Sequence, residues 1–264
     1  MSNDFILNSD IISVFEKNGV VLLKNMIDNK WQRILLDAIE EDIKKPGPFF
    51  HAYKTEEGKG NFHGNLRIWE HYQGLKDYCL NSPLPYFAAQ LLNSNKINLF
   101  YDQLFVKEPE TNNRIRWHND QPYWPIRGWP VISFWTSLDP ISKENGPMEF
   151  IRKSHKWGKW YQPEHFAPGA SIAYEQNPEF EKIPDIESNR DKYDIISFDM
   201  NPGDLLAFHA LVVHGSAGNI SKDRRRRGYS VRYTGNDVFY CTEKGSHLDL
   251  RNPELEDGDR LDSK

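Results

Sequence analysis

The stretch RWHNDQPYW, from Arg116 to Trp124, carries the pattern on which the interpretation of this sequence depends. His118 and Asp120 are separated by one residue near the end of a predicted strand, Arg114 to His118. Side chains alternate along a strand, so the imidazole and the carboxylate face the same way. Together they supply two ligands of the facial triad that binds iron(II) and leaves open positions on the metal. A short His-x-Asp sequence also arises by chance, and a structural role for it stays open at this point.

The third ligand of such a triad is expected to be a distant histidine, and the stretch GDLLAFHALVVHGSAGNIS (203–221) offers two of them. We favour His214, because the glycine that follows it permits a tight turn at a strand end, where a ligand can project into a cavity. His209 is then expected to be a buried core residue. The large separation from His118 in the chain demands tertiary proximity rather than a local loop.

A fixed cation is expected a little further on, in DRRRRGYSVRY (223–233). A buried guanidinium holds a carboxylate through two parallel hydrogen bonds, which suits it to anchor the far end of 2-oxoglutarate while the keto acid end chelates iron. Arg226 opens a predicted strand and is the favoured anchor. A solvated basic turn explains some of the other arginines, and Arg225 remains a rival.

The rest of the chain predicts helices first and short strands afterwards. Ser9 is expected to cap a helix that runs to Glu16, a strand covers 19–25, and apolar positions recur every three or four residues over 29–45. The segment 46–65 is expected to be a long loop. Further helices are predicted over 75–80 and 84–92, and the predicted strands are 97–107, 114–118, 131–138, 148–152, 194–198, 204–208 and 226–234. This order predicts a β-sandwich or barrel with helices on one side, and such a barrel can hold a small ligand in its mouth.

Charge and cysteine content exclude several classes of protein. The net charge of −5 and the short run of basic residues argue against a nucleic-acid partner. Cys79 and Cys241 are too few and too far apart for a disulfide framework, which fits a reducing compartment. The first ten residues lack a signal peptide, and no stretch of about 18 apolar residues occurs. We therefore expect a cytoplasmic protein with no membrane association and no obligate protein partner.

At this point the sequence resembles the phytanoyl-CoA dioxygenase family of iron(II)- and 2-oxoglutarate-dependent oxygenases. The resemblance runs from about Asp102 to Tyr233, through YDQLFVKEP, WHNDQPYWP, SFWTSLDPI, NGPMEFIRKSHKWG, NPGDLLAFH, HGSAGNIS and RRGYS. It implies that iron(II), 2-oxoglutarate and O2 are used, and that the fold is mainly β with flanking helices, a double-stranded β-helix (a cupin-like jelly roll). Family members place one residue fewer between the distal histidine and the anchoring arginine, which keeps Arg225 as a rival, although the RRGYS register favours Arg226.

Carried over by position, the resemblance implies roles for individual residues. Iron would be bound by His118, Asp120 and His214, and the distal carboxylate of 2-oxoglutarate by Arg226 with help from Ser216. An aromatic that packs beside the cosubstrate matches Trp135, and positions that line its pocket match Gln103 and Asn119. The chain is expected to form a single domain, 1–264, with an N-terminal helical buttress over about 8–95, a jelly-roll core over about 96–235, an insertion or lid over about 157–192 and a loosely held acidic tail over about 250–264.

The expected activity is hydroxylation of a small molecule, such as a natural-product intermediate, an amino-acid derivative or a phosphonate. Related halogenases have a small residue where Asp120 stands, so the carboxylate disfavours halogenation. Desaturation, cyclisation or demethylation remain alternatives. So do two other classes, a non-catalytic carbohydrate-binding β-sandwich and a cupin-like metalloenzyme that does not use 2-oxoglutarate. By position, the substrate is expected to meet Phe49, Phe50, His51, His63, Trp69, Gln121, Tyr123 and Trp124.

Overall fold

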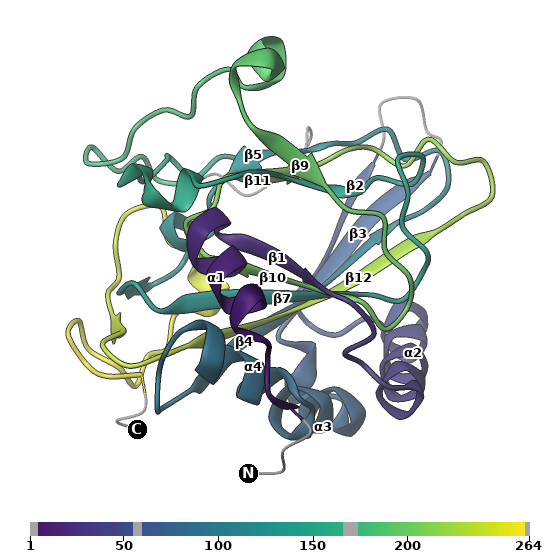
Figure 1. Ribbon diagram of the computed structural model, residues 1–264, viewed down its shortest axis with the longest axis horizontal. Coiled ribbons are helices and arrows are strands. Elements are labelled where there is room, and N and C mark those ends of the chain that lie inside the picture. Colours follow the sequence, from purple (N-terminus) through teal and green to yellow (C-terminus); the bar gives the residue numbers. More distant parts are fainter. Residues whose placement is uncertain (1–4, 55–59, 166–173, 262–264) are drawn as a thin grey trace.

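Two antiparallel sheets form the centre of the molecule in the computed structural model, which describes residues 5–54, 60–165 and 174–261. The large sheet has the strand order β1-β10-β7-β12-β4-β3-β2, and the small sheet has the order β5-β11-β8-β9. In Figure 1 the small sheet lies above the large one, while α2, α3 and α4 lie below it. This arrangement is the expected double-stranded β-helix with helices on one side, and the prediction of the fold class is confirmed.

The bounds of the strands follow the expected pattern closely. The large sheet consists of β1 (Val20–Leu23), β10 (Leu205–His209), β7 (Val131–Ser137), β12 (Arg226–Thr234), β4 (Asn98–Lys107), β3 (Asn61–Leu66) and β2 (Phe50–Lys54). The small sheet consists of β5 (Ile115–His118), β11 (His214–Ser216), β8 (Met148–Ile151) and β9 (Ile195–Ser197). A separate pair is made by β6 (Ile126–Arg127) and β13 (Phe239–Tyr240). Each strand predicted after residue 96 is present, and no end shifts by more than one residue.

The helices are α1 (Ser9–Asn18), α2 (Asn29–Lys44), α3 (Gln73–Asn81) and α4 (Leu84–Leu91). The side chain of Asp28 accepts a hydrogen bond from the backbone of Trp31 and so caps α2. The cap expected at Ser9 is instead Asn8, whose side chain accepts from the backbone N–H of Asp10. Short 3-10 helices occupy η2 (Ile68–Glu70), η3 (Gln121–Tyr123), η4 (Ser154–Trp157), η5 (Glu187–Lys192) and η6 (Leu248–Leu250).

The expectation of a long loop over 46–65 was wrong in part, because β2 and β3 form a hairpin there. β3 continues the large sheet by pairing with β4. The segment has few β-branched residues, and it is the neighbouring strand β4 that supplies the hydrogen-bond partners. Local sequence is a weak guide to such a strand, since tertiary context decides strand formation to a large degree.

Alternation along the large sheet separates two environments. Residues such as Leu104, Phe134 and Val231 belong to the apolar cluster shared with the helices. Residues at the alternate positions of the large sheet face the other way. Among them, Trp135 and Phe208 belong to a cluster that includes Phe150 of the small sheet. The helices therefore cover one face of β4, β7 and β12. The opposite face of these strands lines the space between the two sheets.

Two further predictions concern the C-terminal tail and the segment 157–192. The tail is not loose over its described part, because the backbone of Tyr240 accepts from Gly258 and donates to Asp259. Within 157–192 the chain makes a bridge between Tyr161 and Glu181, and residues 166–173 lie outside the described residues, so a lid role stays a prediction.

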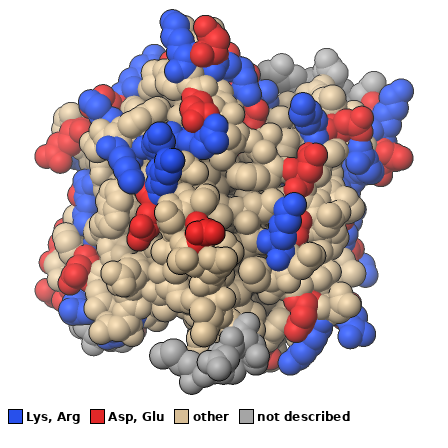
Figure 2. Space-filling view, in the orientation of Figure 1, with Lys and Arg blue, Asp and Glu red and all other residues tan. Residues whose placement is uncertain are grey.

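The surface and the helices give further information on the molecule as a whole. On the face shown in Figure 2, acidic and basic side chains are interspersed. Within the described part of the chain, no helix is both long enough and apolar enough to cross a membrane.

Candidate active site

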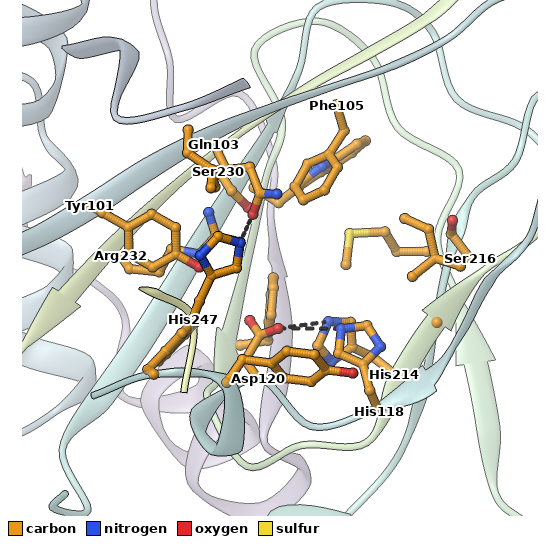
Figure 3. Close-up of a pocket in the computed structure, with 18 of the residues that line it drawn as sticks. Tyr101, Gln103, Phe105, His118, Asp120, His214, Ser216, Ser230, Arg232 and His247 are labelled. Carbon is orange, nitrogen blue, oxygen red and sulfur yellow. Dashed lines mark hydrogen bonds and ion pairs between the residues drawn. The ribbon is translucent and has the colours of Figure 1, made fainter. Parts of the chain in front are cut away.

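A pocket lies between the two sheets and reaches the metal-ligating candidates (Figure 3). Its lining combines apolar and aromatic side chains with a small number of polar groups, which is typical of a small-molecule site. The lining residues are His51, Leu66, Tyr101, Gln103, Phe105, Ile115, His118, Asp120, Tyr123, Trp124, Trp135, Met148, Tyr174, Phe208, His214, Gly215, Ser216, Arg226, Ser230, Arg232, His247 and Leu250.

His118, Asp120 and His214 converge on one point of this pocket. His118 ends β5 and His214 begins β11, and the two residues are direct partners across the antiparallel pair. Asp120 follows β5 by two residues. Its Oδ1 atom lies 3.3 Å from Nε2 of His118 and 3.7 Å from Nε2 of His214. All three ligand atoms lie within 4.8 Å of one another, so a single ion can contact all of them.

Backbone carbonyls orient both imidazole rings. Nδ1 of His118 lies 2.7 Å from the carbonyl oxygen of Arg116, and Nδ1 of His214 lies 3.0 Å from that of Val212. A carbonyl only accepts, so each Nδ1 carries the proton and donates it. Each Nε2 is then left with a lone pair that faces the carboxylate of Asp120, as a metal ligand requires.

Burial and mutual charge set the protonation of His214 and Asp120. Burial and the nearby His118 lower the pKa of His214 to about 4, so its ring is neutral at physiological pH. Burial by itself raises the pKa of Asp120, but the nearby His214, His118 and Arg232 together hold that pKa well below its usual range. Ser133 Oγ donates to the second carboxylate oxygen at 3.3 Å. A neutral imidazole and an ionised carboxylate are the states in which these side chains bind a divalent metal.

A cationic end of the pocket lies beside the triad, at the start of β12. Arg226 is 1% exposed, and its Nε and one terminal nitrogen donate to the carbonyl oxygen of Gly146 at 3.1 and 2.9 Å. Its guanidinium lies 5.3 Å from the ring centre of Trp135. Burial lowers the pKa of Arg226 to about 10, so it keeps its charge at neutral pH. The rival, Arg225, points elsewhere and pairs with Glu40 and Glu108.

Lys107 adds a second polar group at this end. Its Nζ atom donates to Ser216 Oγ at 2.8 Å and to the carbonyl oxygen of Ala217 at 2.6 Å. Burial and the neighbouring Arg226 lower the pKa of Lys107 well below its ordinary value. Sequence reasoning missed this lysine, although it stands two residues after Phe105 and four after Gln103, on the strand face that lines the pocket.

The second candidate histidine has a structural environment. Nε2 of His209 lies 2.9 Å from the carbonyl oxygen of Trp129, and its Nδ1 accepts from the backbone of Leu211 at 3.1 Å. Burial and the nearby His155 lower the pKa of His209 to about 3. Both ring nitrogens are thus engaged by backbone, outside the pocket lining, as expected for a core residue.

The structure brings some of the expected site residues into the pocket and leaves others outside it. Gln103, Trp135, Ser216 and Arg226 line it. Asn119 does not, because its amide donates to the carbonyl oxygen of Lys159 at 2.9 Å and its oxygen accepts from the backbone of Tyr161. Asn119 stands between the two ligands in sequence, and the alternation that directs them inward directs it outward.

Of the residues expected to meet the substrate, only His51, Tyr123 and Trp124 line the pocket. The other five have different partners. Phe50 is exposed and stacks near His63, which itself pairs with Glu108 at 3.7 Å. The remaining three are Phe49, which lies under Arg67, Trp69, which packs against the helices, and Gln121, whose amide donates to the carbonyl oxygen of Gly128.

Arg232 is the most informative lining residue that sequence reasoning missed. The signal was present, since Arg226, Gly228, Ser230 and Arg232 occupy alternate positions of one strand and therefore share a face. His247 and Leu250 were also missed, because they come from a segment after the last long strand that nothing in the local sequence connects to the site.

Comparison with known proteins agrees with this geometry. The family model described as phytanoyl-CoA dioxygenase (PhyH) matches residues 15–228. A probable phytanoyl-CoA dioxygenase of Caenorhabditis elegans is 23% identical over 256 residues, covering 88% of this chain and 77% of that protein. The carbocyclase SnoK from nogalamycin biosynthesis has a TM-score of 0.78 at 18% identity, covering 99% and 96% of the two chains. EctD from S. alaskensis, solved with 2-oxoglutarate and 5-hydroxyectoine, has a TM-score of 0.72 at 18% identity, covering 96% and 84%.

The fold and the site define an enzyme of the iron(II)- and 2-oxoglutarate-dependent oxygenase class. The match over most of its length shows that the chain belongs to the phytanoyl-CoA dioxygenase family.

The residues present fit the two cofactors of that class. A His-Asp-His set whose ligand atoms converge suits iron(II), and a buried guanidinium at the end of the same pocket suits a carboxylate.

Proposed function

We propose that this enzyme hydroxylates a free small molecule and couples that reaction to the oxidative decarboxylation of 2-oxoglutarate to succinate and carbon dioxide. One observation carries the proposal: the Nε2 atoms of His118 and His214 and the carboxylate of Asp120 converge on a pocket whose other wall contains the buried guanidinium of Arg226. A non-catalytic sandwich has no use for this combination of buried, costly polar groups. In a cupin-like metalloenzyme that does not use 2-oxoglutarate, Arg226 would have no ligand to bind.

The protein's own residues hold and shield the reactants. His118, Asp120 and His214 would hold iron(II), and Arg226 would bind the distal carboxylate, so that the keto acid end points toward the metal. Trp135 covers the cosubstrate end, and the ring of Phe208 lies 4.9 Å from that of His214, which excludes water from that side. When bound, iron(II) with 2-oxoglutarate and O2 supplies the oxidising power that breaks a substrate C–H bond.

Hydroxylation is preferred over halogenation because of Asp120. Its carboxylate would fill the ligand position that a halide needs. Desaturation, cyclisation and demethylation begin with the same C–H cleavage, and SnoK is a carbocyclase. The candidate substrates remain a natural-product intermediate, an amino-acid derivative or a phosphonate-like metabolite. The product therefore has to be identified chemically.

The test has a binding arm and a product arm. Anaerobic addition of iron(II) and 2-oxoglutarate to the protein is expected to give a weak visible charge-transfer band, and Asp120→Ala is expected to abolish hydroxylation in air. In air, release of succinate across a metabolite library is expected to identify substrates, and the product is expected to be heavier than its substrate by one oxygen atom derived from O2. Absence of the band at saturating ligand would refute the oxygenase assignment, while a product without added oxygen would refute hydroxylation alone.

A further inference from the structure

Arg232 carries a buried positive charge on the opposite side of the metal triad from Ser216 (Figure 3). It is 3% exposed and lies on the face of β12 that also presents Arg226. One terminal nitrogen donates to Gln103 Oε1 at 3.1 Å. The guanidinium lies 4.5 Å from the ring centre of Tyr101 and 5.8 Å from that of Trp124.

Most of the hydrogen-bonding capacity of this guanidinium is unused. Nε and Nη1 of Arg232 are buried and have no hydrogen-bond partner in the described part of the chain. Within the same residues no carboxylate forms an ion pair with it, although its charge is near enough to lower the pKa of Asp120. A buried charge that lacks a partner costs several kcal/mol, and the aromatic contacts offset only part of that cost. The fold thus retains a charge that a ligand can neutralise.

The charged residues that line the pocket indicate the sign and the magnitude of the charge on that ligand. Among the described residues that line it there are two arginines, Arg226 and Arg232, and a single carboxylate, Asp120. One positive charge is therefore left over. Iron(II) and the 2-oxoglutarate dianion cancel each other, so loading the enzyme leaves the same excess. A monoanion restores neutrality, whereas a dianion overshoots.

The surroundings of Arg232 describe the rest of the molecule that is bound. Tyr101, Trp124, Leu66 and Leu250 supply apolar and aromatic surface on this side of the pocket. Such surface favours an apolar or aromatic body next to the anionic group.

We infer that Arg232 binds a carboxylate of the substrate, so that the enzyme selects apolar or aromatic monocarboxylic acids and holds them beside the metal. This inference rests on the proposed function, because it treats Arg226 as the cosubstrate anchor. The two arginines on this face of β12 then have separate roles, because Arg226 binds the cosubstrate and Arg232 binds the substrate. Gln103 fixes the plane of the Arg232 guanidinium.

The test measures binding to the anaerobic iron(II) and 2-oxoglutarate complex by calorimetry. The probes are phenylacetate, its neutral counterpart phenylacetamide, and phenyl phosphate. We expect the wild-type protein to bind phenylacetate most tightly. We expect Arg232→Gln to weaken phenylacetate binding by about tenfold to a hundredfold, the range for losing a charge-assisted hydrogen bond, and to leave phenylacetamide unchanged. Arg232→Lys, which keeps the charge, is expected to recover part of the affinity.

Controls separate this inference from the proposed function. Arg225→Gln makes the same change at a half-buried arginine outside the pocket and is expected to alter the binding of neither probe. The charge-transfer band reports 2-oxoglutarate binding and is expected to titrate in Arg232→Gln as in the wild type. Loss of the band in Arg232→Gln would make this residue a cosubstrate contact and overturn the inference, whereas absence of the band in the wild type would refute the proposed function.

Two further results would overturn the assignment of a carboxylate. One is that the wild-type protein binds phenylacetate and phenylacetamide equally well, or binds neither. The other is that it binds phenyl phosphate more tightly than phenylacetate. A structural role is tested by Arg232→Met without ligands. We expect this variant to resist urea at least as well as the wild type, because it removes an unsatisfied buried charge. A clear loss of stability would show that Arg232 serves the fold instead.

Discussion

At the scale of single residues, strand alternation decides which of two adjacent arginines reaches the pocket. Arg226 and Arg225 differ by one position, and their surroundings differ completely: the first is buried beside Trp135, and the second pairs with Glu40 and Glu108. Sequence favoured Arg226 because it opens a predicted strand and because the register of the family resemblance agrees, but a run of four arginines kept Arg225 as a rival.

We predict that Arg226→Gln raises the dissociation constant of 2-oxoglutarate by about tenfold or more, since a charge-assisted contact with a carboxylate contributes about 1.5–3 kcal/mol. Anaerobic titration of the charge-transfer band measures this constant. The matched variant Arg225→Gln is expected to bind 2-oxoglutarate like the wild type. An effect of the same size in both variants would contradict the assignment of Arg226.

At the scale of elements, the sequence predicted the strands in which apolar and polar residues alternate regularly. It did not predict a strand that forms because a neighbouring strand supplies its hydrogen-bond partners. β12 was predicted with its observed bounds, because apolar and polar residues alternate from Arg226 to Tyr233. β2 was missed, because its pairing with β3 rather than its own composition makes it a strand. The same limit applies to Asp102 of β4, whose burial against α3 and β12 no local pattern reveals.

We predict a pH-dependent stability effect at Asp102. Burial raises the pKa of its carboxyl from 3.8 to about 7, against the hydrogen bond from Tyr229, so the folded protein holds a proton that the unfolded chain releases. Stability should therefore fall as the pH rises from about 4 to about 7, by an amount on the order of 4 kcal/mol, and then level off. Asp102→Asn mimics the protonated acid and should lack this fall. Urea unfolding of both proteins across this range measures the difference, and parallel curves would contradict the prediction.

We also predict that Gly228 of β12 is required for the position of Trp135 of β7. A Cβ atom at Gly228 would lie 2.1 Å from Cζ2 of Trp135, so the indole, which lies beside Arg226, has to move. Gly228→Ala is expected to destabilise the fold by about 1–3 kcal/mol and to weaken 2-oxoglutarate binding. Gly47→Ala is a control, because its nearest neighbour is a side-chain atom at 3.3 Å. Wild-type affinity and stability in Gly228→Ala would contradict the prediction.

At the scale of the whole molecule, the candidate metal site joins parts of the chain that lie far apart. His118 and His214 are cross-strand partners in the small sheet, which the spacing in sequence could suggest but not establish. The triad was predicted because residue types and a family pattern coincide. His247 was missed because it reaches the pocket only through the packing of the C-terminal segment, whereas Arg232 and Lys107 were missed although strand alternation places them on the pocket face.

We predict that a divalent metal stabilises the protein as a whole. Cobalt(II) at about a hundred times its dissociation constant should add about 2.7 kcal/mol to the free energy of unfolding. For a chain of this size, each kcal/mol raises the melting temperature by about 2–4 °C. His214→Gln should abolish the rise measured by calorimetry, and His209→Gln should keep it, because its ring contacts backbone groups, Trp129 and His155 rather than the triad. A rise that survives in His214→Gln would contradict the triad.

The lining of the pocket is divided between two kinds of chain segment. The metal-ligating candidates and both arginines belong to β5, β11 and β12 or directly follow them, whereas Tyr174, His247 and Leu250 come from connections outside the two sheets. Evolution can therefore replace the second group without disturbing strand register. Directed evolution could exploit the same division: libraries restricted to those connecting residues should yield catalysts with new preferences that still assemble the same oxidising centre.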